Sequence, residues 1–216
     1  MACLVRAIHA AGVDAGQWPA VLEQMRADFD ASVVTIGRHE FASGADAPLY
    51  ESPDDLHFSR DSAAFAARNP WYLSSDDYVA GRVMTGDDIV STAALKRTDF
   101  YRGFLQPRGL LHRLCGVAAQ RGSSAYLLSA YRREERGAFD AADKDQLRSL
   151  LGHVTLSLES QWRWQEADDM AHALLALSTG LAALINATLL YRGLRRQGVY
   201  VPSATWRRLL PQVAAA

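Results

Sequence analysis

An uncharged run of 22 residues, Met170–Tyr191, limits what the C-terminal part of this chain can become. The run exceeds the roughly 18–20 apolar residues that predict a membrane-spanning helix, and its mean hydropathy of about 1.7 lies near the usual threshold. A helix of this length measures about 33 Å, enough to cross a hydrocarbon core of roughly 30 Å. We therefore expect a helix that prefers a bilayer or another apolar surface to water.

The charge of the chain changes at the same place. All 24 acidic residues lie at or before Asp169, so residues 1–170 carry a net charge of −6 and the remaining residues +5. This step predicts a domain at 1–168 and, at 169–216, an apolar transmembrane helix with a basic tail. We expect inner-membrane association through residues 170–191. Because arginines follow the run directly, the positive-inside rule predicts that this end of the helix lies in the cytoplasm. The arginines are Arg192, Arg195, Arg196, Arg207 and Arg208.

Polar and small residues share one face of this expected helix. His172, Thr179 and Asn186 recur every seven positions, and small residues lie beside them at the spacing with which membrane helices pack closely. An alternative stays open, because Leu174 and Leu181 belong to a 3–4 spacing that is also typical of a soluble coiled-coil seam. The expected helix-packing residues are Ala176, Gly180, Ala183, Asn186 and Ala187.

The first 165 residues mix helical and strand-like patterns, which predicts an α+β fold. We expect an antiparallel sheet flanked by helices, then a long helix and a C-terminal apolar helix. The expected elements are a helix from Trp18, strands at 32–36 and 48–51, a helix at 58–68, an extended piece at 82–85, a helix at 91–105, hairpin strands at 114–119 and 125–131, and a helix from Asp140 to at least Glu166.

The last of these helices has a leucine-rich face. Asp140, with Asp143 three residues further on, is typical of a helix N-terminus. Apolar side chains then recur at helical spacing, and we expect a homodimer through Leu147–Trp164. The face consists of Leu147, Leu150, Leu151, Val154 and Leu158.

Composition and motifs exclude several function classes. Cys3 and Cys115 are too few for a disulfide scaffold or a four-cysteine zinc site. The sequence has no G-x-S-x-G, P-loop or H-E-x-x-H motif, so we expect no enzyme activity, catalytic residue, metal or cofactor. The negative charge of residues 1–170 repels phosphate, which argues against direct nucleic-acid binding. The N-terminal residues show no secretory signal, so we expect residues 1–168 in the cytoplasm.

Short motifs run through residues 1–165 in a fixed order. They are Gln17-Trp18-Pro19, Asn69-Pro70-Trp71, Gly81-Arg82-Val83-Met84-Thr85 with Asp87-Asp88, Phe100-Tyr101, Phe104-Leu105, Pro107-Arg108-Gly109-Leu110 with His112, and Phe139. In this order they resemble the N-terminal sensory region of bacterial LuxR-type transcriptional regulators. The resemblance implies a GAF/PAS-like fold and a small-molecule effector. The helix-turn-helix with which such regulators bind DNA has no counterpart in this sequence.

Aromatic residues are the candidate ligand site. The resemblance implies that they gather around the sheet of a GAF/PAS-like module, where related domains hold small ligands. Core packing alone is the other explanation, and both stay open at this point. The candidate ligand-binding residues are Phe65, Trp71, Tyr72, Phe100, Tyr101, Phe104 and Tyr126.

A second resemblance covers residues 174–210. The matching residues are Leu177-Ser178-Thr179-Gly180-Leu181-Ala182-Ala183-Leu184, Asn186, Leu189-Leu190-Tyr191-Arg192-Gly193-Leu194-Arg195, Gln197-Gly198-Val199-Tyr200, Pro202 and Trp206. They look like a late transmembrane segment of the lipid II flippase family (MurJ/MviN). Three hypotheses follow: a non-catalytic sensory module, a fragment of a flippase that serves peptidoglycan precursor transport, or an inert fusion of the two.

Overall fold

The computed structural model describes residues 2–52 and 58–198 and divides the chain into two compact units, Met1–Arg163 and Trp164–Ala216. Six residues named above lie outside the described part of the chain. They are Val199, Tyr200, Pro202, Trp206, Arg207 and Arg208.

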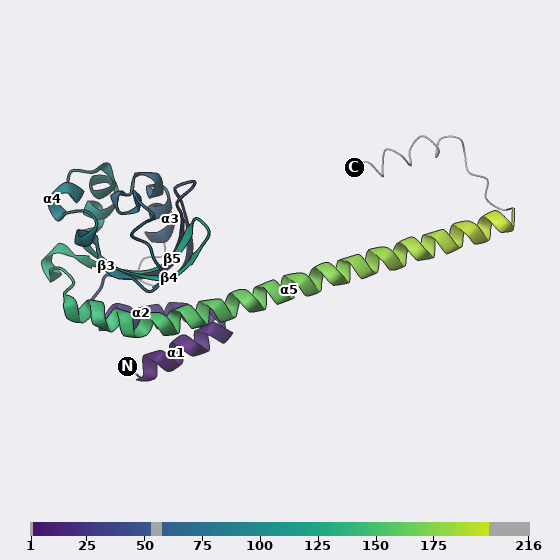
Figure 1. Cartoon of the computed structure of the whole chain (residues 1–216), viewed down its shortest axis with the longest axis horizontal. Coiled ribbons are helices and arrows are strands. Elements are labelled where there is room, and N and C mark those ends of the chain that lie inside the picture. The colour runs from purple at the N-terminus through teal and green to yellow at the C-terminus, as the bar shows by residue number, and fades with distance from the viewer. Residues whose placement is uncertain (1, 53–57, 199–216) are drawn as a thin grey trace. The chain divides into compact units, whose positions relative to one another are not determined.

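The first unit is built on a five-stranded sheet in the order β2-β1-β5-β4-β3, in which every neighbouring pair is antiparallel (Figure 1). Helices lie on both faces of the sheet, so the α+β fold class predicted from the sequence is confirmed. The strands are β1 (Val33–Glu40), β2 (Ala45–Glu51), β3 (Val83–Thr85), β4 (Leu110–Arg121) and β5 (Ser124–Arg133).

Alternation along the strands gives the sheet two different faces. Leu114 of β4 and Leu128 of β5 point to one face, where they join the larger hydrophobic core. Their neighbours point to the opposite face, where Arg113 lies opposite Tyr131 and Cys115 lies opposite Ser129 in the β4–β5 pairing. One register therefore produces an apolar face and a face with polar side chains.

The apolar face is covered by α2 (Trp18–Asp28) and the first part of α5 (Ala141–Arg196), and α1 (Ala2–Val13) packs against these two helices (Figure 1). Gln161 of α5 ties this layer together, because its amide donates to Ala11 O at 2.5 Å and its carbonyl accepts from Trp18 Nε1 at 3.2 Å. Gly12 permits the close approach of α1 to α5, since a Cβ there would lie 2.9 Å from Cβ of Ser157. The sequence did not predict α1.

The other face is covered by residues 58–80 and 86–108, which we call the cap segment (Figure 1). The helix expected at 58–68 is only α3 (Phe58–Ala63), followed by a 3₁₀ turn, and the helix expected at 91–105 is only α4 (Thr92–Leu95), followed by a π-helical turn at Tyr101–Leu105. The Thr98 hydroxyl accounts for the second break, because it donates to Leu95 O at 2.7 Å and accepts from Tyr101 N at 3.1 Å. The 3₁₀ turns of the chain are Ala15–Gln17, Ala66–Arg68, Pro70–Tyr72, Gly86–Asp88, Gln106–Arg108 and Glu134–Arg136.

The long helix α5 begins with the expected carboxylate pair. Asp140 accepts from Asp143 N at 2.9 Å, and Asp143 accepts from Asp140 N at 3.0 Å, which satisfies two backbone N–H groups at the helix N-terminus. The two helices expected after this point are a single α-helix of 56 residues. The predicted helical state of Met170–Tyr191 is therefore confirmed.

The leucine-rich face of α5 is buried within its own chain. Its five apolar side chains belong to the larger core beneath the sheet. A homodimer through Leu147–Trp164 would therefore use the exposed side of the helix, which carries Leu156. The homodimer itself stays a prediction.

The described part of the chain contains one helix long and apolar enough to cross a membrane, which is α5. Its most apolar window of 18 residues has a mean hydropathy of 1.9, and none of that window is buried.

We expect Leu158→Ala to lower the free energy of unfolding by about 2–5 kcal/mol, because it leaves a cavity under the sheet. Leu158 is 1% exposed, whereas Leu156, two residues away on the same helix, is 59% exposed. The matched control Leu156→Ala should change this free energy by less than about 0.5 kcal/mol. Urea unfolding measures both, and equal effects would contradict the packing of α5 described above.

Candidate functional site

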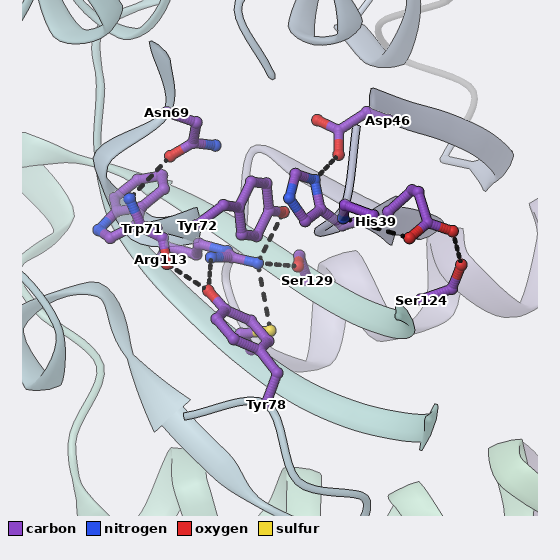
Figure 2. A network of polar contacts seen from close by, with 12 residues as sticks. His39, Asp46, Asn69, Trp71, Tyr72, Tyr78, Arg113, Ser124 and Ser129 are labelled. Atoms are coloured by element: carbon purple, nitrogen blue, oxygen red, sulfur yellow. Dashed lines mark hydrogen bonds and ion pairs between the residues drawn. The ribbon is translucent and has the colours of Figure 1, made fainter. Parts of the chain in front are cut away.

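A charged side chain lies at the centre of the sheet face beneath the cap segment. Arg113 of β4 is only 1% exposed. Figure 2 shows its guanidinium surrounded by hydroxyl and thiol groups from the sheet and the cap segment. Nη1 donates to the Tyr78 hydroxyl at 3.3 Å, and Nη2 lies 3.0 Å from Tyr72 Oη, 3.1 Å from Ser129 Oγ and 3.2 Å from Cys115 Sγ.

All hydrogen-bond acceptors of Arg113 are hydroxyl or thiol groups. In the described part of the chain, no carboxylate oxygen lies within 4.0 Å of its guanidinium nitrogens. An arginine keeps its proton in proteins, so this buried side chain remains a cation. Burying a charge without an opposite charge is costly, and buried charges are normally paired. The missing counter-ion is the most unusual feature of the domain.

Two N–H groups beside this cation have no acceptor in the structure. They are Nε of Arg113 and Nε1 of Trp71, both buried. The guanidinium carbon lies 5.2 Å from the Trp71 ring centre and 5.0 Å from that of Tyr72, which are cation–π distances. Aromatic rings therefore stabilise the charge in part, and two donors are left for an acceptor from elsewhere.

The tyrosines of the site are held in their neutral form. Burial raises the pKa of Tyr72 well above its ordinary value and also raises the pKa of Tyr78 and Tyr131, and in each case Arg113 opposes the shift. Tyr78 donates its proton to the carbonyl oxygen of Trp71 at 2.8 Å. Near neutral pH the tyrosines therefore supply hydroxyl groups and no negative charge.

A cavity of about 40 Å³ lies next to this network. The Tyr72 ring separates it from Arg113, because Tyr72 stacks on His39 with ring centres 4.0 Å apart on one side and lies against the guanidinium on the other. His39 Nδ1 lies 2.6 Å from Asp46 Oδ1, so the one carboxylate that lines the cavity is already paired. A second cavity, of about 20 Å³, is lined by Trp71 and Arg113.

The structure brings six of the seven candidate aromatic residues together. Four belong to one buried cluster between the sheet and the cap segment, and Phe65 and Tyr72 pack against it. Tyr126 does not join them, which corrects the expected grouping: it points to the opposite face of the sheet and contacts Trp162, with ring centres 4.4 Å apart. The four are Trp71, Phe100, Tyr101 and Phe104.

The sequence analysis missed the polar residues of the site. Arg113 was left outside the expected strand, which began at Leu114, although β4 begins at Leu110. A charged residue inside a long apolar strand was the available signal, since Leu114 and Cys115 follow it. The other missed residues are His39, Asp46, Phe58, Tyr78, Ser129 and Tyr131.

A larger open groove at the other end of the sheet is a weaker candidate. Its volume is about 530 Å³, and four arginines line it. Each of them already has an acidic partner, such as Asp30 at 2.8 Å from Arg136 and Asp61 at 2.5 Å from Arg108. The described residues contain no group of three or more side chains that could hold a metal ion.

The raised pKa values make the domain sensitive to alkali. A tyrosine whose pKa is higher in the folded state stabilises the fold below about pH 10 and loses that contribution as the pH rises through the folded-state pKa. We expect the free energy of unfolding to fall between about pH 9 and 11, and to fall less in Tyr78→Phe. Urea unfolding across this range measures the effect, with Tyr126→Phe as a control for loss of a hydroxyl outside the network. An equal pH dependence in wild type and Tyr78→Phe would contradict it.

Known structures include proteins with a similar fold. No family model matches the chain. The structure of the VqsR LBD domain from Pseudomonas aeruginosa has a TM-score of 0.58 at 15% identity and covers 74% of this chain and 94% of that domain. SdiA of Escherichia coli has a TM-score of 0.51 at 16% identity and covers 74% of this chain and 66% of SdiA. These likenesses show the fold alone, which the described unit of this chain shares with both structures.

The curated proteins that match the sequence include one that is similar over a short stretch. Lipid II flippase MurJ of Burkholderia cenocepacia is 45% identical over 47 residues, which is 22% of this chain and 9% of the flippase. The match thus spans about a tenth of that protein. The described unit built on the sheet is therefore similar in fold to the VqsR LBD domain, and a separate stretch of 47 residues is similar in sequence to part of the flippase.

Proposed function

We propose that residues 1–163 form a non-catalytic sensory module that binds a small molecule between the sheet and the cap segment. One observation carries the proposal, namely the buried network around Arg113, which holds a charge and two N–H donors without partners. Polar groups that lack hydrogen-bond partners and are surrounded by aromatic rings are typical of a ligand site. In such a site the apolar walls give affinity and a few polar groups fix the orientation of the ligand. The likeness to a VqsR structure described as an LBD domain supports the same conclusion.

The cavities are smaller than a ligand site, so binding requires the cap segment to shift. Ligand pockets usually have roughly 300–1,000 Å³, whereas the cavity beside Tyr72 has about 40 Å³. The cap segment consists of short pieces: α3 has 6 residues, α4 has 4, and 3₁₀ and π-helical turns connect them. Short elements of this kind open locally at lower cost than long helices or central strands. The sheet would supply fixed polar groups and the cap segment an adjustable wall.

A blocking variant tests this proposal without knowledge of the ligand. Thr35 of β1 lines the cavity, and Thr35→Phe adds a volume larger than the cavity. We expect a methanol extract of purified wild-type protein to contain a small molecule that is absent from the extract of Thr35→Phe, as measured by mass spectrometry. Ser149→Phe adds the same ring on the exposed side of α5 and is the matched control. Extracts of wild type and Thr35→Phe that agree, with or without small molecules, would contradict a site at this place.

A second proposal concerns the C-terminal unit and starts from the exposure of its side chains. We propose that Met170–Tyr191 inserts into the inner membrane, while residues 1–168 remain in the cytoplasm. Large apolar side chains along this stretch are exposed, among them Leu174, Leu181 and Leu189. Exposed apolar surface on this scale is unusual for a soluble chain and marks a protein or membrane contact. The flippase match supports a membrane origin for the segment.

Vesicle flotation tests this second proposal. The full chain should float with vesicles of phosphatidylethanolamine and phosphatidylglycerol. The double variant Leu174→Asp, Leu181→Asp should stay at the bottom of the gradient, because each carboxylate at the centre of a bilayer costs a few kcal/mol. The double variant Leu73→Asp, Val79→Asp adds the same charge at exposed positions of the first unit and should float like wild type. A wild-type chain that does not float would contradict insertion.

A further inference from the structure

We infer that the small molecule of the sensory module is an apolar monocarboxylate whose carboxylate group pairs with Arg113. This inference rests on the proposed function and adds the chemical class of the ligand. Its starting point is the charge of the site, where a cation that is 99% buried has only hydroxyl and thiol groups as acceptors in the described part of the chain.

The open hydrogen-bond positions call for an acceptor. Nε of Arg113 and Nε1 of Trp71 are both donors, and neither has a partner. The two side chains line the same cavity of about 20 Å³. A neutral water molecule in that space would satisfy a donor but would leave the charge uncompensated. A carboxylate is an acceptor-only group and would satisfy both the donors and the charge.

Asp87 lines the same cavity of about 20 Å³, but its side chain is exposed and accepts from the Thr92 hydroxyl at 2.6 Å, and no carboxylate oxygen of the described residues lies within 4.0 Å of the Arg113 guanidinium nitrogens. Asp46 is the carboxylate that lines the neighbouring cavity, and it is held by His39 at 2.6 Å. The three tyrosines stay protonated near neutral pH because burial raises the pKa of each. The described residues therefore place no carboxylate against Arg113, and the proposed ligand supplies one.

The surroundings indicate one negative charge and an apolar body. Arg113 is the one buried arginine or lysine among the described residues that line the two cavities, since Arg38 at the edge of the larger cavity is exposed. A dianion such as a phosphate monoester would bring two negative charges, and Arg113 would neutralise only one of them. Phe58, Tyr72 and Tyr131 line the larger cavity, so the rest of the ligand meets aromatic rings. The Tyr72 ring, which lies between His39 and the guanidinium, would move aside when the carboxylate of a ligand in the larger cavity reaches Arg113.

Matched pairs of probes test the inference on the full chain. Octanoate is compared with octanamide, and benzoate with benzamide, at pH 7.5 by calorimetry and by the shift of the melting temperature. We expect at least one carboxylate to bind wild type about tenfold or more tightly than its amide, a ratio that corresponds to one charge-assisted interaction. Thr35→Phe, which blocks the cavity, should bind neither member of the pair.

Variants of Arg113 assign the preference to this residue. Arg113→Met should bind acid and amide equally, whereas Arg113→Lys keeps the charge and should keep part of the preference. Without ligand, Arg113→Met should melt at the same temperature as wild type or higher, because it removes an uncompensated buried charge. If Arg113→Met does not fold, the ratio of carboxylate to amide affinity in wild type and in Arg113→Lys tests whether Arg113 binds the carboxylate.

The outcomes separate this inference from the proposed function. Equal binding of acids and amides, or a co-purified small molecule without an acidic group, would overturn the inference and leave the sensory module standing. Absence of binding by both carboxylates would overturn the inference as well. The proposed function fails only if wild type also yields no small molecule that Thr35→Phe lacks.

Discussion

The first unit depends on the antiparallel pairing of β4 with β5. These two strands form the centre of the sheet, and their register places Leu114 and Leu128 on one face and Arg113 and Ser129 on the other. A slip by one residue would move every side chain to the opposite face, which would bring the guanidinium into the leucine layer under the sheet. The same pairing therefore fixes the hydrophobic core and the polar site together. A change in the register of β4 against β5 would disrupt both the hydrophobic core and the polar site.

Local patterns predicted the parts of the fold that are set by local physics. The alternating apolar runs became β4 and β5, and the Asp140–Asp143 carboxylate pair begins α5 as expected. The charge step at Asp169 wrongly suggested two separate helices. Side-chain charge does not end a helix, and the segment from Glu166 to Tyr191 contains no proline to break it. The short pieces of the cap segment were also missed, because they are shaped by side chains such as Thr98 that compete for backbone hydrogen bonds.

The candidate site was predictable only in its apolar part. Aromatic residues near the motifs of the sensory family were expected to gather, and six of the seven do. Tyr126 was misplaced because its parity along β5 is opposite to that of Tyr131, a distinction that needs the strand register. The burial of Arg113 could not be read from its neighbours in sequence. It results from Trp71, Tyr72 and Tyr78, which lie more than 30 residues earlier and cover the strand from the cap segment.

The short pieces of the cap segment have a consequence for how long the protein survives in a cell. A ligand that binds only the folded state stabilises it in proportion to the logarithm of its concentration. Under the proposed function, a module without ligand opens at the cap segment more often and is cleaved by proteases faster than a module with bound ligand. The cellular amount of the protein would then rise with the concentration of its ligand, and protection from degradation would be the first step of signalling.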